Sequence, residues 1–191
     1  MNEPTNDITT IPDITRTTRL NMREKLAWAE RSFGRMTDAI DGDHDSVQDH
    51  FWSFLHGVHL LWFYLGRWVK ESGGGSSTKR LIEEWKRESL SPDESVAWES
   101  LRCLRDQDAH VEPVVPKKPE GGRLLYDPTS GKILYSARTG KLLLSKRKPF
   151  RITQDGTELE LLSVCEAGLA ASQKLVRDFD DGVFVCGGAK R

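Results

Sequence analysis

The sequence predicts a mainly α fold, a four- to five-helix bundle with a small antiparallel β-meander inserted before the last helix. Apolar residues recur at the spacing of amphipathic helices through most of residues 20–112 and again in residues 158–179. Between these parts the period changes, because residues 130–136 and 139–145 are near copies separated by turn residues, as in short adjacent strands. The composition, 37% hydrophobic and 30% charged, is typical of a globular chain.

We divide the chain into five parts. They are a disordered N-terminal arm (1–18), a helical bundle (19–112), a basic β-meander insertion (113–156), the closing helix of the bundle (157–180) and a tail (181–191). The arm is rich in Thr, Asn and Asp and lacks the basic start and apolar run of a secretion signal, which favours disorder.

The bundle is expected to begin with two long helices. Residues 20–40 carry apolar side chains at loose helical spacing among charged neighbours. The turn residues 41–43 end this helix, and Asp45 or Ser46 can cap a second helix that runs to about Glu71.

The second helix is aromatic on nearly every side over residues 51–69, a length that approaches a membrane span. His56, His59 and Arg67 interrupt this stretch, so we expect no membrane contact. A helix that is apolar all round is the buried centre of a bundle, or is covered on one side by its own domain and on the other by a second copy. The two histidines either face each other across such an interface or are hydrogen-bonded core residues.

A third and a fourth helix follow a Gly-rich connector. The glycines of residues 72–78 follow no strand and precede no Gly-Lys-Ser/Thr, so they indicate a linker and not a phosphate loop. Residues 79–89 predict a short third helix. The fourth begins with Ser91 as the cap, Pro92 in the first position and Glu94 closing a capping box.

The fourth helix carries the candidate catalytic residues, which are Arg105, Asp106 and His110. Its apolar stripe is expected from Val96, Leu101 and Leu104, with Trp98 and Cys103 alongside. The stripe leads to a cation and an imidazole near the helix end, which Pro113 and Pro116 terminate.

An Arg and a His together supply charge neutralisation at phosphorus and a proton acceptor near neutral pH. Asp106 precedes His110 by four positions, so it can hydrogen-bond the imidazole and orient it. Arg105 and His110 are five positions apart, about 140° around a straight helix. They therefore need a broken helix end, the long reach of the Arg side chain, or a partner from another chain.

The insertion is strongly basic. Residues 116–151 contain ten Lys and Arg against two acidic residues, whereas the whole chain has a net charge of -1. This pattern favours either a polyanion-binding segment on an acidic body or a solvated basic loop. The residues predicted to bind nucleic acid are Arg138, Lys141, Lys146, Arg147, Lys148 and Arg151.

Two long helices, a short third helix and a fourth that carries Arg105, Asp106 and His110 resemble the HEPN superfamily (higher eukaryotes and prokaryotes nucleotide-binding domains). The hallmark of that family is an Arg followed by four to six residues and a His, with a polar residue directly after the Arg. The resemblance implies a metal-independent endoribonuclease of toxin or defence type, without a cofactor, in which a homodimer brings Arg and His together in one cleft. It also implies RNA as substrate and allows for a neutralising protein partner.

In the expected reaction His110 withdraws the 2′-hydroxyl proton of RNA while Arg105 stabilises the negative charge that develops on the phosphoryl oxygens. DNA lacks this hydroxyl and should not be cut. One alternative is a non-catalytic interaction module that binds nucleic acid or an acidic protein through its insertion. For the motif itself, the alternative is an ordinary charged helix end with Arg102 paired to Asp106 and Arg105 paired to Asp108.

No metal site is predicted. Acidic and imidazole side chains gather at residues 43–50, but their order lacks a recognised ligand pattern and acids favour helix starts. The three cysteines, Cys103, Cys165 and Cys186, have neither close pairing nor metal-ligand spacing, which favours a reducing cytoplasm.

Overall fold

The computed structural model describes residues 11–40, 44–72, 78–110, 114–117, 149–154 and 156–184. Over these ranges the chain forms five packed helices and a two-stranded antiparallel sheet directly before the last helix, so the predicted fold class is confirmed. The elements are α1 (Ile11–Ala39), α2 (His44–Glu71), α3 (Thr78–Ser89), α4 (Pro92–His110), β1 (Arg151–Gln154), β2 (Thr157–Glu160) and α5 (Leu161–Asp180).

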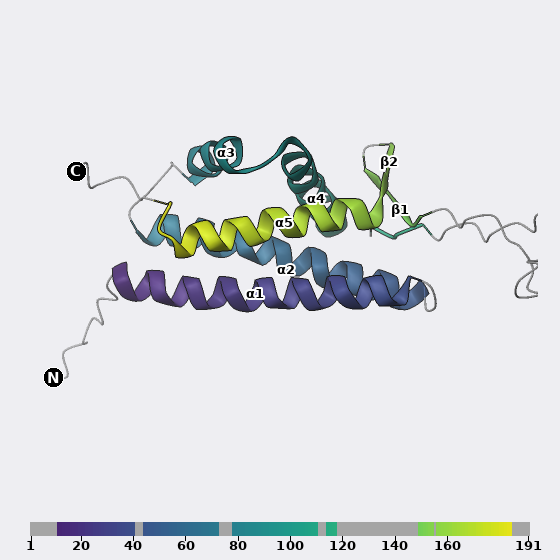
Figure 1. Ribbon diagram of the computed structural model, residues 1–191, viewed down its shortest axis with the longest axis horizontal. Helices are drawn as coiled ribbons and strands as arrows, with labels where there is room; N and C mark the ends of the chain where they lie inside the picture. The colour runs from purple at the N-terminus through teal and green to yellow at the C-terminus, as the bar shows by residue number, and fades with distance from the viewer. Residues whose placement is uncertain are drawn as a thin grey trace, which may run out of the picture.

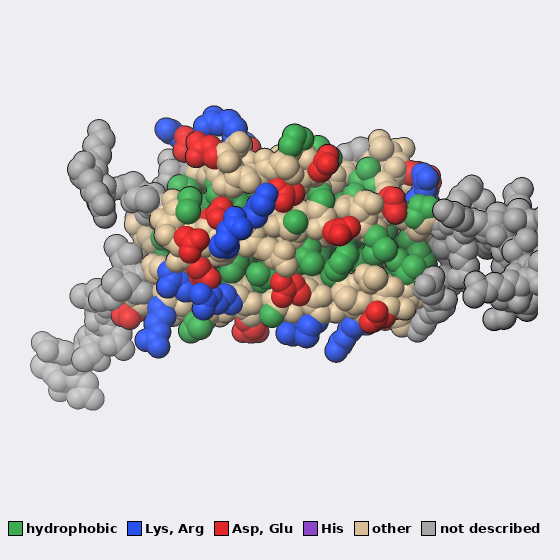
Figure 2. All heavy atoms as spheres, in the orientation of Figure 1, with side chains coloured by type: hydrophobic (Ala, Val, Ile, Leu, Met, Phe, Trp, Pro, Cys, Tyr) green, Lys and Arg blue, Asp and Glu red, His purple; other side chains and the backbone are tan. Residues whose placement is uncertain are grey.

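The helices α1 and α2 form a long antiparallel pair, and α5 runs beside them along the length of the molecule (Figure 1). The two shorter helices, α3 and α4, lie on the other side of α5 from α1 (Figure 1). The hairpin of β1 and β2 lies at the end of the molecule where α5 begins (Figure 1). On the face that α5 crosses, cationic and acidic side chains are mixed and the described part of the chain displays no histidine (Figure 2).

Two apolar clusters hold the helices together. The first joins α2, α4 and the hairpin through buried residues that include Phe51, Phe54, Leu101, Leu104 and Ile152. The second joins the far end of α2 to α3, α4 and α5 through buried aromatic residues: Trp68, Trp85, Trp98, Phe179 and Phe184. Burial of side chains of this size is the main favourable term for folding.

Helices α1 and α2 are in close contact at Gly57. A Cβ atom at that position would lie 3.2 Å from the Cβ atom of Ala29 and 3.3 Å from its Cα atom. Two small residues facing each other let the helix backbones approach closely, which explains why the glycine occurs inside an otherwise aromatic helix.

Helix α1 begins earlier than predicted. The sequence predicts a disordered arm up to residue 18, whereas the structure is helical from Ile11. The reason is tertiary packing: Trp68 Nε1 donates a hydrogen bond of 2.9 Å to Thr15 Oγ1, and Thr18 is buried. Ile14 packs against the second apolar cluster.

The closing helix begins later than predicted. Residues 157–160 form β2, and α5 starts at Leu161. The strand pairs with β1 in the register Arg151↔Glu160 and Gln154↔Thr157, and Gly156 in the turn has a φ of +78°, a value that favours glycine. The strands predicted at 130–136 and 139–145 lie outside the described residues.

No helix in the described ranges is long and apolar enough to span a membrane. Polar side chains interrupt α2, as predicted from His56, His59 and Arg67.

Candidate active site

The start of α4 is fixed by the capping box that the sequence predicts. The backbone nitrogen of Ser91 donates to Glu94 Oε2 at 2.8 Å, and the backbone nitrogen of Glu94 donates to Ser91 Oγ at 3.3 Å. Pro92 occupies the first helical position. Lys174 of α5 also binds Glu94, at 2.6 Å, so the cap is attached to the bundle.

The buried side of α4 determines where Arg105 lies. Ala97, Trp98, Leu101 and Leu104 are buried, whereas Val96 is 66% exposed, so the expectation that Val96 belongs to the apolar stripe is wrong. Trp98 and Val96 lie about 200° apart around a helix, so burying the larger aromatic residue turns the valine outward. Arg105 lies one turn after Leu101, at the edge of this stripe, and its side chain is 29% exposed.

The guanidinium of Arg105 is held by Asp106. Arg105 Nη1 lies 3.4 Å from Asp106 Oδ1, and Arg102 Nη1 lies 3.5 Å from Asp106 Oδ2. The second of these pairs is the one expected for an ordinary charged helix end. The other expected pair, Arg105 with Asp108, lies outside the described side chains.

The ion pairs continue from Arg102 to α3. Arg102 Nε lies 2.9 Å from Glu99 Oε2, and Glu99 in turn binds Lys86. Lys86 also pairs with Glu83 at 3.1 Å. A chain of alternating charges therefore runs from α3 along α4 and ends at Arg105, which restricts the positions that its guanidinium can adopt.

His110 is the last residue of α4, and its side chain lies outside the described part of the structure. The predicted Asp106–His110 hydrogen bond therefore stays a prediction. The helix is continuous from Pro92 to His110, so no break brings residues 105 and 110 onto one face. Of the three ways in which Arg105 and His110 can meet, the reach of the Arg side chain and a second protein copy remain.

A second imidazole, that of His59 on α2, lies within electrostatic range of Arg105. Burial lowers the pKa of His59, and the positive charges of Arg105 and His56 lower it further, while Asp106 acts in the opposite direction. The ring lies edge-on to Trp62 with 6.2 Å between ring centroids. Its Nδ1 atom is buried and has no hydrogen-bond partner among the described residues, so the interpretation of His59 as a hydrogen-bonded core histidine is not supported at this nitrogen.

The Arg–His motif does not include His59, because His59 and Arg105 are far apart in the sequence. The proximity to Arg105 arises from packing, since Trp62 of α2 contacts Trp98 of α4 with 4.6 Å between ring centroids. The only sequence signal is a histidine inside a predicted core helix, where an imidazole is uncommon.

The surface of α2 is partly uncovered in the single chain. Phe63 is 54% exposed and Trp52 is 36% exposed. His56 is exposed as well, and its ring lies 5.8 Å from that of Trp28 on α1. The homodimer predicted through this helix therefore has an aromatic surface available to it.

The described end of the insertion lies near the C-terminal half of α4. Val114, Phe150 and Ile152 belong to the same buried cluster as Leu104. Trp52 Nε1 of α2 also donates to the carbonyl oxygen of Val114 at 2.8 Å.

Among the six residues predicted to bind nucleic acid, Arg151 alone is described. Arg151 Nη1 lies 3.3 Å from Glu158 Oε2, and Lys117 Nζ lies 3.1 Å from Glu158 Oε1. One carboxylate thus faces two cations. Arg138, Lys141, Lys146, Arg147 and Lys148 lie outside the described residues.

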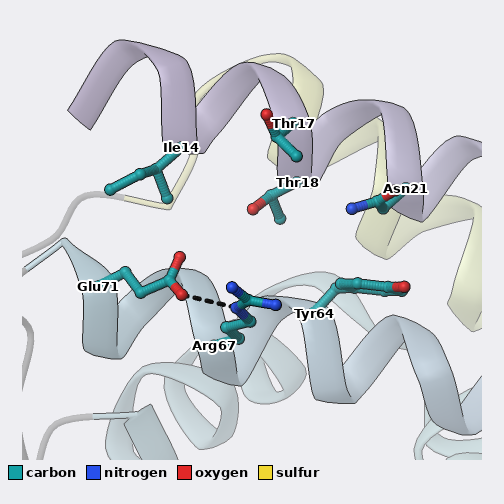
Figure 3. Close-up of a pocket in the computed structure, with 7 residues that line it drawn as sticks. All are labelled: Ile14, Thr17, Thr18, Asn21, Tyr64, Arg67 and Glu71. Atoms are coloured by element: carbon teal, nitrogen blue, oxygen red, sulfur yellow. Dashed lines mark hydrogen bonds and ion pairs between the residues drawn. The ribbon is translucent and has the colours of Figure 1, made fainter. Parts of the chain in front are cut away.

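A small groove between α1 and α2 lies beside the Arg67–Glu71 ion pair (Figure 3). Its volume is about 140 Å³, and its lining residues are Ile14, Thr17, Thr18, Asn21, Tyr64, Arg67 and Glu71. Arg67 Nε binds Glu71 Oε1 at 2.6 Å, so the cation of the groove is already neutralised.

Comparison of the chain with protein-family models, curated proteins and solved structures finds no match. In the described ranges, no three His, Cys, Asp or Glu side chains are arranged to hold a metal ion. Part of the acidic and imidazole cluster at residues 43–50, including Asp43 and the His44 side chain, lies outside those ranges.

Proposed function

We propose that this protein is a HEPN-like, metal-independent endoribonuclease that acts as a homodimer. The observation that carries the proposal is the position of Arg105: a partly exposed guanidinium held by Asp106 at 3.4 Å, near the end of a capped helix. A guanidinium suits transition-state stabilisation because its planar fork can bind two phosphoryl oxygens together.

In the proposed reaction the phosphodiester of RNA is bound by Arg105. His110 accepts the proton of the 2′-hydroxyl, whose oxygen then attacks phosphorus and displaces the 5′ oxygen of the next nucleotide. Since Arg105 and His110 occupy different sides of an unbroken helix, His110 of a second copy completes the site in this proposal. The uncovered aromatic surface of α2 supports such an assembly.

The insertion supports RNA as the substrate class. Residues 116–151 carry a large excess of Lys and Arg, and the described end of this segment packs on the same buried cluster as Leu104, one residue before Arg105. Cations near the cleft would bind the RNA backbone beyond the scissile phosphate. A toxin or defence role with a neutralising protein partner would follow from this activity and stays a prediction, as does a cytoplasmic location.

Incubation of the purified protein with labelled RNA in excess chelator tests the proposal. We expect cleavage by the wild-type protein, and loss of cleavage for Arg105→Ala and for His110→Ala. Arg87→Ala is a matched control, because Arg87 is a well-exposed arginine of α3 that pairs with Glu88. DNA of the same sequence should remain intact. Wild-type cleavage by either active-site variant would contradict the assignment.

The second candidate is a non-catalytic module that binds nucleic acid or an acidic protein. The observation that favours it is the Arg102–Asp106 ion pair, which an ordinary helix end would also form. Binding of labelled RNA without cleavage, reduced by replacement of Lys146, Arg147 and Lys148, would establish this candidate instead.

A further inference from the structure

His59 and Arg105 project from the same contact between α2 and α4. Trp62 of α2 packs on Trp98, and Val58 belongs to the same buried cluster as Leu104. His59 lies about one turn before Trp62 on α2, and Arg105 lies about two turns after Trp98 on α4, so each is on the side of its helix that makes this contact. The imidazole and the guanidinium therefore lie on the facing sides of two helices, and their charges interact.

The ring of His59 has unused hydrogen-bonding capacity. Buried polar atoms in proteins nearly always have a partner. The Nδ1 atom of His59 has none among the described residues, and neither has the Nε1 atom of Trp62, one turn further along α2. The Nδ1 atom itself is buried, but His59 as a whole is only half-buried, so a bound molecule can reach another part of the side chain.

The charges around His59 favour an anion. Arg105 from α4 and His56 from α2 both oppose protonation of the imidazole, and Asp106 from α4 is the acid that acts the other way. Asp106 is at the same time shared between Arg102 and Arg105. An anion bound to Arg105 would offset the repulsion and give the imidazole an acceptor.

We propose that His59 is a second imidazole of the candidate active site and contacts the RNA phosphate that Arg105 binds. The inference rests on the proposed function and extends it, because it adds a residue outside the Arg–His motif. The lowered pKa favours the neutral imidazole in the free protein, and a bound phosphodiester favours the protonated form. Protonation of His59 and binding of nucleic acid are therefore coupled, and each favours the other.

The test uses a short single-stranded DNA oligonucleotide, which presents phosphodiesters but cannot be cleaved for lack of the 2′-hydroxyl. The pKa of His59 is measured by NMR in protein with ¹⁵N-labelled histidine, with and without the oligonucleotide. We expect the oligonucleotide to raise this pKa by about one unit, which corresponds to about tenfold tighter binding to the protonated form. In Arg105→Gln the shift should disappear.

Affinity measurements with matched variants complete the test. At pH 6 we expect His59→Gln to weaken oligonucleotide binding by up to about tenfold, whereas His50→Gln should leave it unchanged. His50 is the control because it is a half-buried histidine of the same helix, nine positions before His59. Circular dichroism of both variants checks that the helices are retained.

The outcomes separate this inference from the ribonuclease proposal. If RNA is cleaved in chelator but the His59 resonances and oligonucleotide affinity do not respond, the inference fails and the ribonuclease stands. If the oligonucleotide raises the pKa of His59 but no RNA is cleaved, the phosphate contact stands and the ribonuclease fails. If the oligonucleotide does not bind at pH 6, the inference is overturned.

Discussion

Arg105 Nη1 lies 3.4 Å from Oδ1 of Asp106, its neighbour in the sequence, and this pair holds a guanidinium near the end of α4. A lysine would keep the positive charge but lose the planar fork that binds two oxygens. We therefore expect Arg105→Lys to be nearly as damaging as Arg105→Ala, with kcat/KM for RNA cleavage reduced about 100-fold or more. Arg87→Lys is the control, and wild-type-like cleavage by Arg105→Lys would refute the bidentate role.

The charges on α4 should also be visible in the titration of His59. Arg105 lowers the pKa of His59 and Asp106 raises it. Replacing Arg105 by Gln should therefore raise this pKa, and replacing Asp106 by Asn should lower it further. NMR titration of the imidazole measures both shifts in the absence of nucleic acid. Shifts of the same sign in the two variants would contradict the arrangement.

The sequence is a good guide where structure depends on neighbouring residues. The capping box of Ser91 and Glu94 forms as predicted, because cap, proline and glutamate interact within one turn. The sequence does not predict the first turns of α1, because they depend on Trp68, a residue 53 positions away from its hydrogen-bond partner Thr15.

In the candidate site, too, the sequence predicts the local interactions but not the long-range ones. The Arg102–Asp106 and Arg105–Asp106 pairs follow from helix spacing. The approach of His59 to Arg105 depends on the crossing of α2 and α4, which the Trp62–Trp98 contact determines. Local sequence spacing does not determine how α2 and α4 cross, so the sequence does not predict that His59 lies near Arg105.

Helix α5 packs closely on α4 at Gly168. A Cβ atom at this position would lie 2.1 Å from Leu101 Cδ1, and Leu101 is completely buried. Because the leucine must move within a packed core, we expect Gly168→Ala to lower the free energy of unfolding by about 1–3 kcal/mol.

Gly34→Ala is the control for this prediction, since Gly34 is an exposed residue of α1 and an added Cβ would meet nothing within 4 Å. Alanine is the better helix former, so this variant should be up to about 1 kcal/mol more stable than the wild type. Urea unfolding curves measure both changes. Equal effects of the two substitutions would show that α4 and α5 are not in the described contact.

A buried hydrogen bond joins α3 to α5. Trp85 Nε1 donates to Asp178 Oδ2 at 2.9 Å, and both side chains are largely buried. Trp85→Phe removes the donor and leaves the carboxylate oxygen without it, so we expect a loss of about 2 kcal/mol in unfolding free energy. Asp178→Asn retains an acceptor oxygen, so it should lower the unfolding free energy less than Trp85→Phe does. A larger loss for Asp178→Asn than for Trp85→Phe in denaturant unfolding would argue against this hydrogen bond.

Acid should weaken the attachment of the α4 cap to α5. Burial acts to raise the pKa of Glu94, but the hydrogen bonds from Lys174 and Ser91 outweigh it, so this pKa is lowered. A carboxylate with a lowered pKa in the folded state stabilises the fold fully above its ordinary pKa of about 4.3. The stabilisation is lost as the pH falls through the lowered value.

Lys174→Met isolates this contribution, because Lys174 Nζ lies 2.6 Å from Glu94 Oε2. The variant should be less stable than the wild type at pH 7, and the difference should shrink as the pH falls below about 4. Lys79→Met, at the exposed start of α3, should give a difference that does not change with pH. Unfolding free energies from pH 7 to pH 3 provide the comparison. A Lys174→Met difference that stays constant over this range would mean that the ion pair does not lower the pKa of Glu94.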